Sequence, residues 1–227
     1  MSWAAAIVAA GRGTRLGRPK QLIDVAGIPL AGWAMRSLAT MPEIVDVVIV
    51  TDPEFIDAMR ELAQQIFGAR SLRVVIGGAT RQASVKCALD VLPARCTHVL
   101  VHDGARPLVR ARDVRAGMAK VAAGRGAVLA TPVVDTIKIV DPRTMTVVET
   151  LPRGALWAAQ TPQFATRADF ERAHAEAAVG GIEATDDVAL LERIGVEVAI
   201  VPSSGENFKV TVEEDLVRAE LLLREGL

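Results

Sequence analysis

Short apolar segments alternate with longer amphipathic segments along most of the chain. Apolar runs predict strands at residues 3–9, 45–51, 72–76, 98–102, 127–133 and 196–202. Apolar positions at helical spacing between the first five strands predict helices over residues 29–40, 53–67, 80–92 and 112–122. This alternation is typical of βαβ units, so we expect an α/β fold with a mostly parallel sheet and flanking helices. The length of 227 residues fits a single domain, 1–227.

The alternation breaks between about residues 134 and 160. Two β-type runs, Thr136 to Val140 and Thr144 to Thr150, flank the turn-forming sequence Asp141-Pro142-Arg143. This arrangement predicts a β-hairpin. Because an isolated hairpin is only marginally stable in water, we expect this arm to pack against something, and a second subunit is a candidate.

The C-terminal segment predicts one more helix. Thr211 and Glu214 have the spacing of a capping box, which favours a helix start at this point. The apolar positions that follow at helical spacing are Leu216, Ala219, Leu222 and Leu223. We expect this face to pack on the sheet.

The composition excludes several functional classes. With 26 basic against 27 acidic residues and an aromatic fraction of 4%, the chain lacks the charge and the rings of a general nucleic-acid binder. Two cysteines and three histidines, with no CxxC motif, supply little material for a disulfide scaffold or a zinc site. No apolar run is long enough to span a bilayer or has the flanks of a signal peptide, so we expect a cytoplasmic protein.

The charge is unevenly distributed near the N-terminus. The first acidic residue is Asp24, and four cations precede it: Arg12, Arg15, Arg18 and Lys20. They lie in a glycine-rich segment after the first strand, where backbone N–H groups and cations can surround phosphate oxygens. The spacing Gly11-x-Gly13-x-x-x-Gly17 matches neither the dinucleotide fingerprint nor a P-loop. The segment by itself predicts only a phosphate site.

Further motifs follow this loop in order. They are Gly77-Gly78 with Arg81 and Ser84, His102-Asp103-Gly104-Ala105-Arg106-Pro107, Asp135-Thr136-Ile137-Lys138, Arg153, Thr161-Pro162-Gln163, Thr185-Asp186-Asp187 and Asn207-Phe208-Lys209. The loop pattern AAGxGxRxxxxxPKQ resembles sugar-phosphate and polyol-phosphate nucleotidyltransferases, and equally the cytidylyl- and guanylyltransferases of molybdenum cofactor maturation. The whole set, which covers nearly the entire chain, resembles the 2-C-methyl-D-erythritol 4-phosphate cytidylyltransferase family of the non-mevalonate isoprenoid pathway.

The resemblance implies a fold and a reaction. The fold is a Rossmann-like twisted sheet of the nucleotidyltransferase type with a protruding β-hairpin arm. The reaction converts CTP and 2-C-methyl-D-erythritol 4-phosphate to 4-diphosphocytidyl-2-C-methyl-D-erythritol and pyrophosphate. The resemblance also implies a homodimer in which the arm, at about residues 134–160, reaches the neighbouring active site, so that Arg153 acts in trans.

The resemblance also assigns site residues. Arg15 and Lys20 match cations that stabilise the transition state, and Arg153 and Lys209 match the pair that positions the methylerythritol phosphate. The residues expected to bind CTP are Ala9, Ala10, Gly11, Gly13, Arg15, Lys20, Gly78, Ser84 and Asp103. Those expected to bind the acceptor are Asp103, Arg106, Thr136, Arg153, Thr161, Thr185 and Lys209. Mg²⁺ is the expected cofactor, held mainly by phosphates, with Asp103 as a candidate ligand. The chain departs from the common pattern at Gly104, where alanine is frequent, and at Ala79, where some members carry a polar residue.

The chemistry is consistent with these residue types. A phosphate monoester is mostly dianionic at neutral pH, so the attacking group needs no general base. The main requirement is to bring two polyanions together, for which fixed cations are suited. We therefore expect His102 to be packed or hydrogen-bonded rather than catalytic, and Asp186 and Asp187 to cap a helix.

Two alternative functions stay open at this point. The first is a pentitol phosphate cytidylyltransferase acting on ribitol 5-phosphate, whose signatures overlap heavily with those above. The second is a non-catalytic nucleotide-binding protein. The presence of cations at both the triphosphate and the acceptor positions argues against the second.

Overall fold

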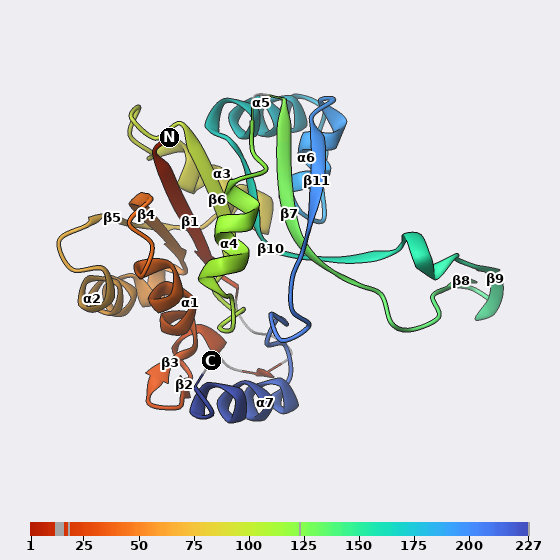
Figure 1. Ribbon diagram of the computed structural model, residues 1–227, viewed down its shortest axis with the longest axis horizontal. Coiled ribbons are helices and arrows are strands. Elements are labelled where there is room, and N and C mark those ends of the chain that lie inside the picture. Colours follow the sequence, from red (N-terminus) through yellow and green to blue (C-terminus); the bar gives the residue numbers. More distant parts are fainter. Residues whose placement is uncertain (12–15, 18, 123, 227) are drawn as a thin grey trace.

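Seven strands form the central sheet of the protein. They are β1 (Trp3–Ala9), β4 (Ile44–Thr51), β5 (Ser71–Ile76), β6 (His98–Asp103), β7 (Arg125–Pro132), β10 (Trp157–Thr166) and β11 (Glu197–Pro202). Their order is β11-β7-β10-β6-β1-β4-β5 (Figure 1). Only β10 runs antiparallel to its neighbours in this sheet, so the predicted, mostly parallel α/β architecture is confirmed. The computed structural model describes residues 1–11, 16–17, 19–122 and 124–226.

Helices cover both faces of the sheet. One face packs against α1 (Leu30–Ala39), α2 (Ile56–Phe67) and α4 (Ala111–Met118), and the other against α3 (Arg81–Asp90), α5 (Arg167–Val179) and α6 (Asp187–Arg193). Because both faces are covered, β1 is apolar along its whole length and its side chains enter the two cores alternately. None of the helices in the described ranges is long and apolar enough to cross a membrane.

Strand β10 was not predicted from the sequence. It carries Pro162 together with the buried polar residues Gln160, Thr161 and Gln163. A proline normally argues against a central strand because it cannot donate to the ladder. The pairing of β10 with β7 shifts register between Ala159 and Gln163, so the proline falls where the regular ladder is interrupted.

The predicted hairpin is present as β8 (Lys138–Asp141) paired with β9 (Thr146–Thr150). It extends from the ends of β7 and β10 away from the rest of the molecule (Figure 1). The turn is closed by Asp141, whose Oδ1 accepts from the N–H of Arg143 at 2.8 Å and whose carbonyl accepts from Met145. Residues from Trp157 onward already pair with β7 as part of β10.

The last helix, α7 (Glu213–Arg224), differs from the expectations in its N-terminal cap and in its packing. The N-terminal cap is made by Asp215, whose Oδ2 accepts from the backbone N–H groups of Thr211 and Val212, rather than by Glu214. The helix begins one residue later than expected, so Asp215 occupies the third helical position from which a side chain reaches back.

The buried face of α7 also packs elsewhere than predicted. Leu216 and Ala219 contact a separate small cluster containing Val25, Leu30 and Val210. Val25 belongs to β2 (Asp24–Val25), which pairs with β3 (Ile28–Pro29) outside the main sheet. Both faces of the sheet are already covered by the other helices, and α7 lies beyond its carboxyl edge (Figure 1).

Candidate active site

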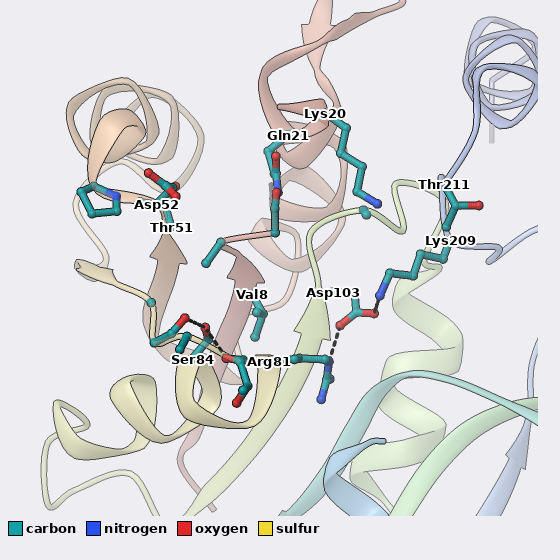
Figure 2. A pocket seen from close by; sticks show the side chains of 18 residues that line it. Val8, Lys20, Gln21, Thr51, Asp52, Arg81, Ser84, Asp103, Lys209 and Thr211 are labelled. Carbon is teal, nitrogen blue, oxygen red and sulfur yellow. Dashed lines mark hydrogen bonds and ion pairs between the residues drawn. The ribbon is translucent and has the colours of Figure 1, made fainter. Parts of the chain in front are cut away.

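A pocket of about 810 Å³ opens at the carboxyl edge of β1, β4, β5 and β6. Its wall is made by strand ends and by the turns that follow them, the position where open α/β sheets bind ligands (Figure 2). It is lined by Val8, Ala10, Gly11, Lys20, Gln21, Thr51, Asp52, Pro53, Gly77, Gly78, Ala79, Thr80, Arg81, Ser84, Asp103, Ala105, Lys209 and Thr211.

The glycine pair after β5 brings the backbone close to the end of β1. A Cβ on Gly77 would lie 2.5 Å from the Cβ of Ala10, and one on Gly78 would lie 2.4 Å from the Cβ of Ala83. Any side chain at these positions would force the turn away from the pocket wall. Ser84 also faces this turn, and its hydroxyl donates to the carbonyl of Thr80 at 2.9 Å. The glycines therefore expose the backbone to a ligand at this wall.

Lys20 and Gln21 form the opposite side of the pocket, on the short helix η2 (Lys20–Leu22). The Nζ of Lys20 donates to the carbonyl of Val210 at 2.8 Å, and the amide of Gln21 donates to the carbonyl of Gly11. These contacts tie η2 to the end of β1 and to the segment that carries Lys209. The predicted site residues Gly13 and Arg15 lie outside the described residues.

Asp103, the last residue of β6, forms the centre of a charged network. Its Oδ1 accepts from Arg81 Nε at 3.0 Å and its Oδ2 from Lys209 Nζ at 2.8 Å (Figure 2). Burial by itself would raise the pKa of this carboxyl, but the charges of Arg81, Lys209 and Arg106 hold it well below its usual range. Asp103 is therefore an anion that organises cations around the pocket.

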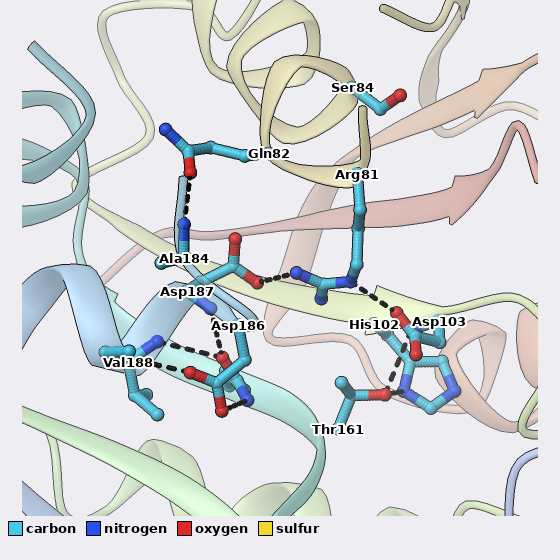
Figure 3. A network of polar contacts seen from close by, with 12 residues as sticks. Arg81, Gln82, Ser84, His102, Asp103, Thr161, Ala184, Asp186, Asp187 and Val188 are labelled. Carbon is cyan, nitrogen blue, oxygen red and sulfur yellow. Dashed lines mark hydrogen bonds and ion pairs between the residues drawn. The ribbon is translucent and has the colours of Figure 1, made fainter. Parts of the chain in front are cut away.

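Arg81 also contacts a second buried carboxylate. Its Nη1 lies 2.8 Å from Oδ2 of Asp187, the first residue of α6 (Figure 3). Burial would lower the pKa of Arg81, but Asp187 and Asp103 raise it, so the guanidinium stays charged. Burial raises the pKa of Asp187 to about 6 in spite of Arg81, and the charges of Asp103 and Asp186 act in the same direction.

The expectation that Asp186 and Asp187 cap α6 is correct for Asp186 but not for Asp187. Asp186 is the N-cap, and its Oδ1 accepts from the N–H of Ala189 at 3.0 Å. Asp187 is only 1% exposed, and its carboxylate faces Arg81. The motif residues Arg81 and Asp187 therefore belong to the charged network, a role that a helix-end argument does not reveal because their contact spans α3 and α6.

Thr161 and His102 form a chain of hydrogen bonds with the backbone of Asp103. The backbone N–H of Asp103 donates to Thr161 Oγ1 at 3.0 Å, and this hydroxyl lies 3.0 Å from His102 Nδ1. His102 Nε2 lies 3.2 Å from the carbonyl of Arg106. Burial lowers the pKa of His102 to about 4, so it is neutral at physiological pH. The prediction that His102 is packed and hydrogen-bonded is confirmed.

Arg106 secures the segment before Lys209. Its Nη1 donates to the carbonyl of Asn207 at 2.7 Å, and the side-chain amide of Asn207 donates to Gln160 and to the carbonyl of Thr161. Neither Arg106 nor Thr161 lines the pocket itself. Their positions indicate that Arg106 and Thr161 support the loop that carries Lys209.

The pocket brings together seven of the predicted site residues: Ala10, Gly11, Lys20, Gly78, Ser84, Asp103 and Lys209. Ala9 is buried in the core at the end of β1 and does not line the pocket. Thr185 is exposed in the turn before α6. Thr136 and Arg153 lie exposed on the arm, where Arg153 Nη1 donates to the carbonyl of Val134 at 2.7 Å. A single chain thus leaves the two arm residues outside the pocket.

The pocket offers few protein ligands to a metal ion. The described residues contain no cluster of three or more His, Cys, Asp or Glu side chains that could hold a metal. The carboxylates among the pocket-lining residues are Asp52 and Asp103. Mg²⁺ requires only one or two protein carboxylates when phosphates supply the other oxygens, so this donor set fits a phosphate-held Mg²⁺.

A comparison with protein families decides which family this architecture represents. The family model described as 2-C-methyl-D-erythritol 4-phosphate cytidylyltransferase matches residues 3–225. The chain belongs to this family. The family resemblance inferred from the motifs is therefore confirmed.

Relatives and solved structures agree with this assignment. The chain is 40% identical to the 2-C-methyl-D-erythritol 4-phosphate cytidylyltransferase of Gloeobacter violaceus, over 97% of this chain and 96% of the relative. It is 39% identical to the enzyme of that name from Halalkalibacterium halodurans, over 99% and 98% of the two chains. Among solved structures, the cytidylyltransferase of Thermus thermophilus has a TM-score of 0.76 at 33% identity, covering 99% and 100% of the two chains. The 4-diphosphocytidyl-2C-methyl-D-erythritol synthase from Anaerococcus prevotii has a TM-score of 0.86 at 26% identity, covering 98% and 96%.

Proposed function

We propose that the protein transfers the cytidylyl group of CTP to 2-C-methyl-D-erythritol 4-phosphate and releases pyrophosphate, in the non-mevalonate isoprenoid pathway. The observation that carries this proposal is the pocket itself, where a glycine-lined wall faces Lys20 and the Asp103–Lys209 pair. The family membership and the names of the relatives support the same activity. They favour methylerythritol phosphate over ribitol 5-phosphate, and catalysis over nucleotide binding alone.

The proposed reaction is an in-line displacement. An oxygen of the acceptor phosphate attacks the α-phosphorus of CTP, a new P–O bond forms, and the bond to pyrophosphate breaks. The cytidine moiety lies against the Gly77–Gly78 turn and the neighbouring Ser84 of α3, and the exposed backbone at Gly78 can hydrogen-bond the base edge. Lys20 and Arg15 stabilise the charge on the triphosphate, and Lys209 binds the acceptor phosphate. No side chain has to remove a proton, in keeping with the buried, neutral state of His102.

Mg²⁺ is part of this proposal. Asp103 is the carboxylate that could bind the ion, which would be held mainly by phosphates and would supply positive charge against the negative charge of the phosphates. Both oxygens of Asp103 already accept from cations, which favours an ion held mainly by the phosphates. Omitting the divalent ion should abolish turnover without changing the fold.

We also propose that the active protein is a homodimer in which the arm completes the partner's pocket. Thr136 and Arg153 lie on the arm outside their own chain's pocket, and the arm exposes apolar side chains that a partner can cover. Met145 is 75% exposed and Val148 is 66% exposed.

CTP is a cytoplasmic metabolite, which favours the cytoplasm as the place of the reaction.

The function is tested by measuring pyrophosphate release from CTP and Mg²⁺ with each acceptor in turn. We expect turnover with methylerythritol phosphate and little with ribitol 5-phosphate. A preference for ribitol 5-phosphate would overturn the proposed acceptor, and no release with either acceptor would overturn the activity. The dimer is tested by mixing Arg153→Ala and Lys20→Ala proteins, each of which should have little activity alone. Recovery of activity supports shared sites, whereas heterodimers without recovery contradict them.

A further inference from the structure

Four charges of alternating sign connect α6 to the acceptor side of the pocket. Asp187 contacts Arg81 Nη1 at 2.8 Å, Arg81 Nε donates to Asp103 at 3.0 Å, and Lys209 donates to the other oxygen of Asp103 at 2.8 Å. The four residues come from α6, α3, β6 and the segment before α7. Figure 3 shows the guanidinium of Arg81 lying between the two carboxylates.

This arrangement determines how much positive charge Lys209 offers to a ligand. If Lys209 were the only ion-pair partner of Asp103, the pair would be close to neutral and would attract a phosphate weakly. Arg81 shares the negative charge of Asp103, so the Lys209 ammonium keeps a positive potential toward the pocket. Asp103 is 6% exposed, so water screens its contact with Arg81 little, whereas 38% of the Lys209 side chain is exposed, which leaves its ammonium accessible to a ligand.

Asp187 determines where Arg81 can lie. An arginine side chain has several rotatable bonds, and a single contact with Asp103 would leave its guanidinium free to swing toward the triphosphate. The second contact, with Asp187, fixes the plane of the guanidinium. Asp187 is in turn held by α6, whose first N–H groups, those of Asp187 and Val188, donate to Gln163 Oε1 at 2.8 and 3.0 Å.

We propose that Arg81 and Asp187 are positioning residues for the acceptor phosphate: Asp187 fixes Arg81, and Arg81 balances Asp103 so that Lys209 stays in place with charge available for the phosphate. This inference rests on the proposed function, because it assigns the acceptor phosphate to Lys209. Neither residue needs to touch the reacting atoms.

The test measures kcat and both KM values for Arg81→Met, Arg81→Lys and Asp187→Asn. Arg81→Met should raise the KM for methylerythritol phosphate about 10- to 100-fold, because Lys209 would lose its charge-assisted hydrogen bond to the phosphate, and Asp187→Asn should raise it less. The KM for CTP should change by less than about threefold. Arg81→Lys keeps the charge and should recover part of the loss. Arg95→Met is a matched control, because Arg95 pairs with a buried aspartate far from the pocket, and its KM values should not change.

A double-mutant cycle separates this role from a structural one. In a Lys209→Met protein, Arg81→Met should have little further effect on the acceptor KM, because the residue through which it acts is gone. The inference would be overturned if Arg81→Met raised the acceptor KM by the same factor in the wild-type and Lys209→Met backgrounds. An unchanged acceptor KM in folded Arg81→Met and Asp187→Asn proteins would also overturn it. Thermal melting shows which variants are folded, and Arg81→Lys serves if Arg81→Met does not fold.

Calorimetric binding of inorganic phosphate gives a second measure that needs no turnover. Binding should weaken in Arg81→Met and should not weaken further when Lys209→Met is already present. If wild-type protein binds phosphate in this pattern but shows no turnover with methylerythritol phosphate, the proposed function fails and the positioning role stands. If turnover is normal and the cycle is additive, only the positioning role fails.

Discussion

Two buried aspartates at opposite edges of the same sheet have different surroundings. At the amino edge, Asp46 accepts from Arg95 through both oxygens at 2.7 and 2.9 Å, from Arg73 at 3.3 Å and from the Cys96 thiol at 3.1 Å. At the carboxyl edge, Asp103 pairs with Arg81 and Lys209. The two sites differ in whether polar atoms near the carboxylate lack a hydrogen-bond partner.

The network around Asp46 is complete, and the one around Asp103 is not. Both oxygens of Asp46 accept hydrogen bonds, and its arginines reach the surface, with 57% of the Arg95 side chain exposed. Near Asp103, the buried Nη2 of Arg81 and Nε of Arg106 have no hydrogen-bond partner among the described residues. A buried donor without a partner costs about 1 to 3 kcal/mol, a cost that an anionic ligand can remove. The first network therefore stabilises the fold, and the second is suited to a ligand.

The largest expected effect is on catalysis at the carboxyl edge. Lys20→Met should lower kcat about 100- to 1,000-fold, since it removes a fixed cation from the transition state, and should leave the melting temperature nearly unchanged. Steady-state kinetics and thermal melting measure the two effects. Lys86→Met, on the exposed face of α3 where Lys86 pairs with Asp90, is the matched control and should have wild-type turnover. Normal turnover in Lys20→Met would remove Lys20 from the mechanism.

The next effect is on stability at the amino edge. Asp46→Asn should reduce the free energy of unfolding by about 2 to 3 kcal/mol, because it removes charge-assisted hydrogen bonds at a fully buried position. The kcat and KM values should stay at wild-type levels. Chemical denaturation gives the stability, and Asp57→Asn, whose side chain is 88% exposed, should cost almost nothing. A loss of activity in stable Asp46→Asn protein would contradict the separation between the two edges.

The smallest effect is a difference in pH dependence. The pKa of Asp46 is lowered: burial would raise it, but hydrogen bonds from Ser71, Cys96, Arg95 and Arg73 outweigh burial. The stability it contributes is therefore present above its ordinary pKa and is lost as the pH falls below that value. The pKa of Asp187 is raised to about 6, so its contribution is greatest at low pH and is lost as the pH rises through about 6.

This difference can be measured with two variants. Relative to wild type, Asp187→Asn should become more stable as the pH rises from about 4 to about 6, because it lacks a carboxyl that stays protonated in the folded protein over this range. Asp46→Asn should approach wild-type stability as the pH falls below the ordinary pKa of an aspartate. Denaturation at several pH values tests both, and parallel pH curves for the two variants would show that the edges do not differ in this way.

Periodicity was sufficient for the elements whose signal is local. The six predicted strands and the hairpin were found because β-branched runs and the Asp141 turn act within a few residues. Strand β10 was missed because Pro162 opposes a strand locally and is tolerated only where the ladder with β7 is interrupted. The packing of α7 was mistaken because an amphipathic face shows that a helix is buried, but does not show which surface covers it.

The amino-acid sequence by itself determined the residue types of the site and the family. Lys20, Gly78, Ser84, Asp103 and Lys209 stand in motifs whose order and spacing are specific, because each glycine or charge has a local chemical reason to be there. Only the tertiary structure decided which charges act together. Arg81 and Asp187 are over 100 residues apart in the sequence and meet because α3 and α6 cover the same face of the sheet. Charge coupling depends on distance and burial in space, and neither quantity is encoded in the spacing of residues along the chain.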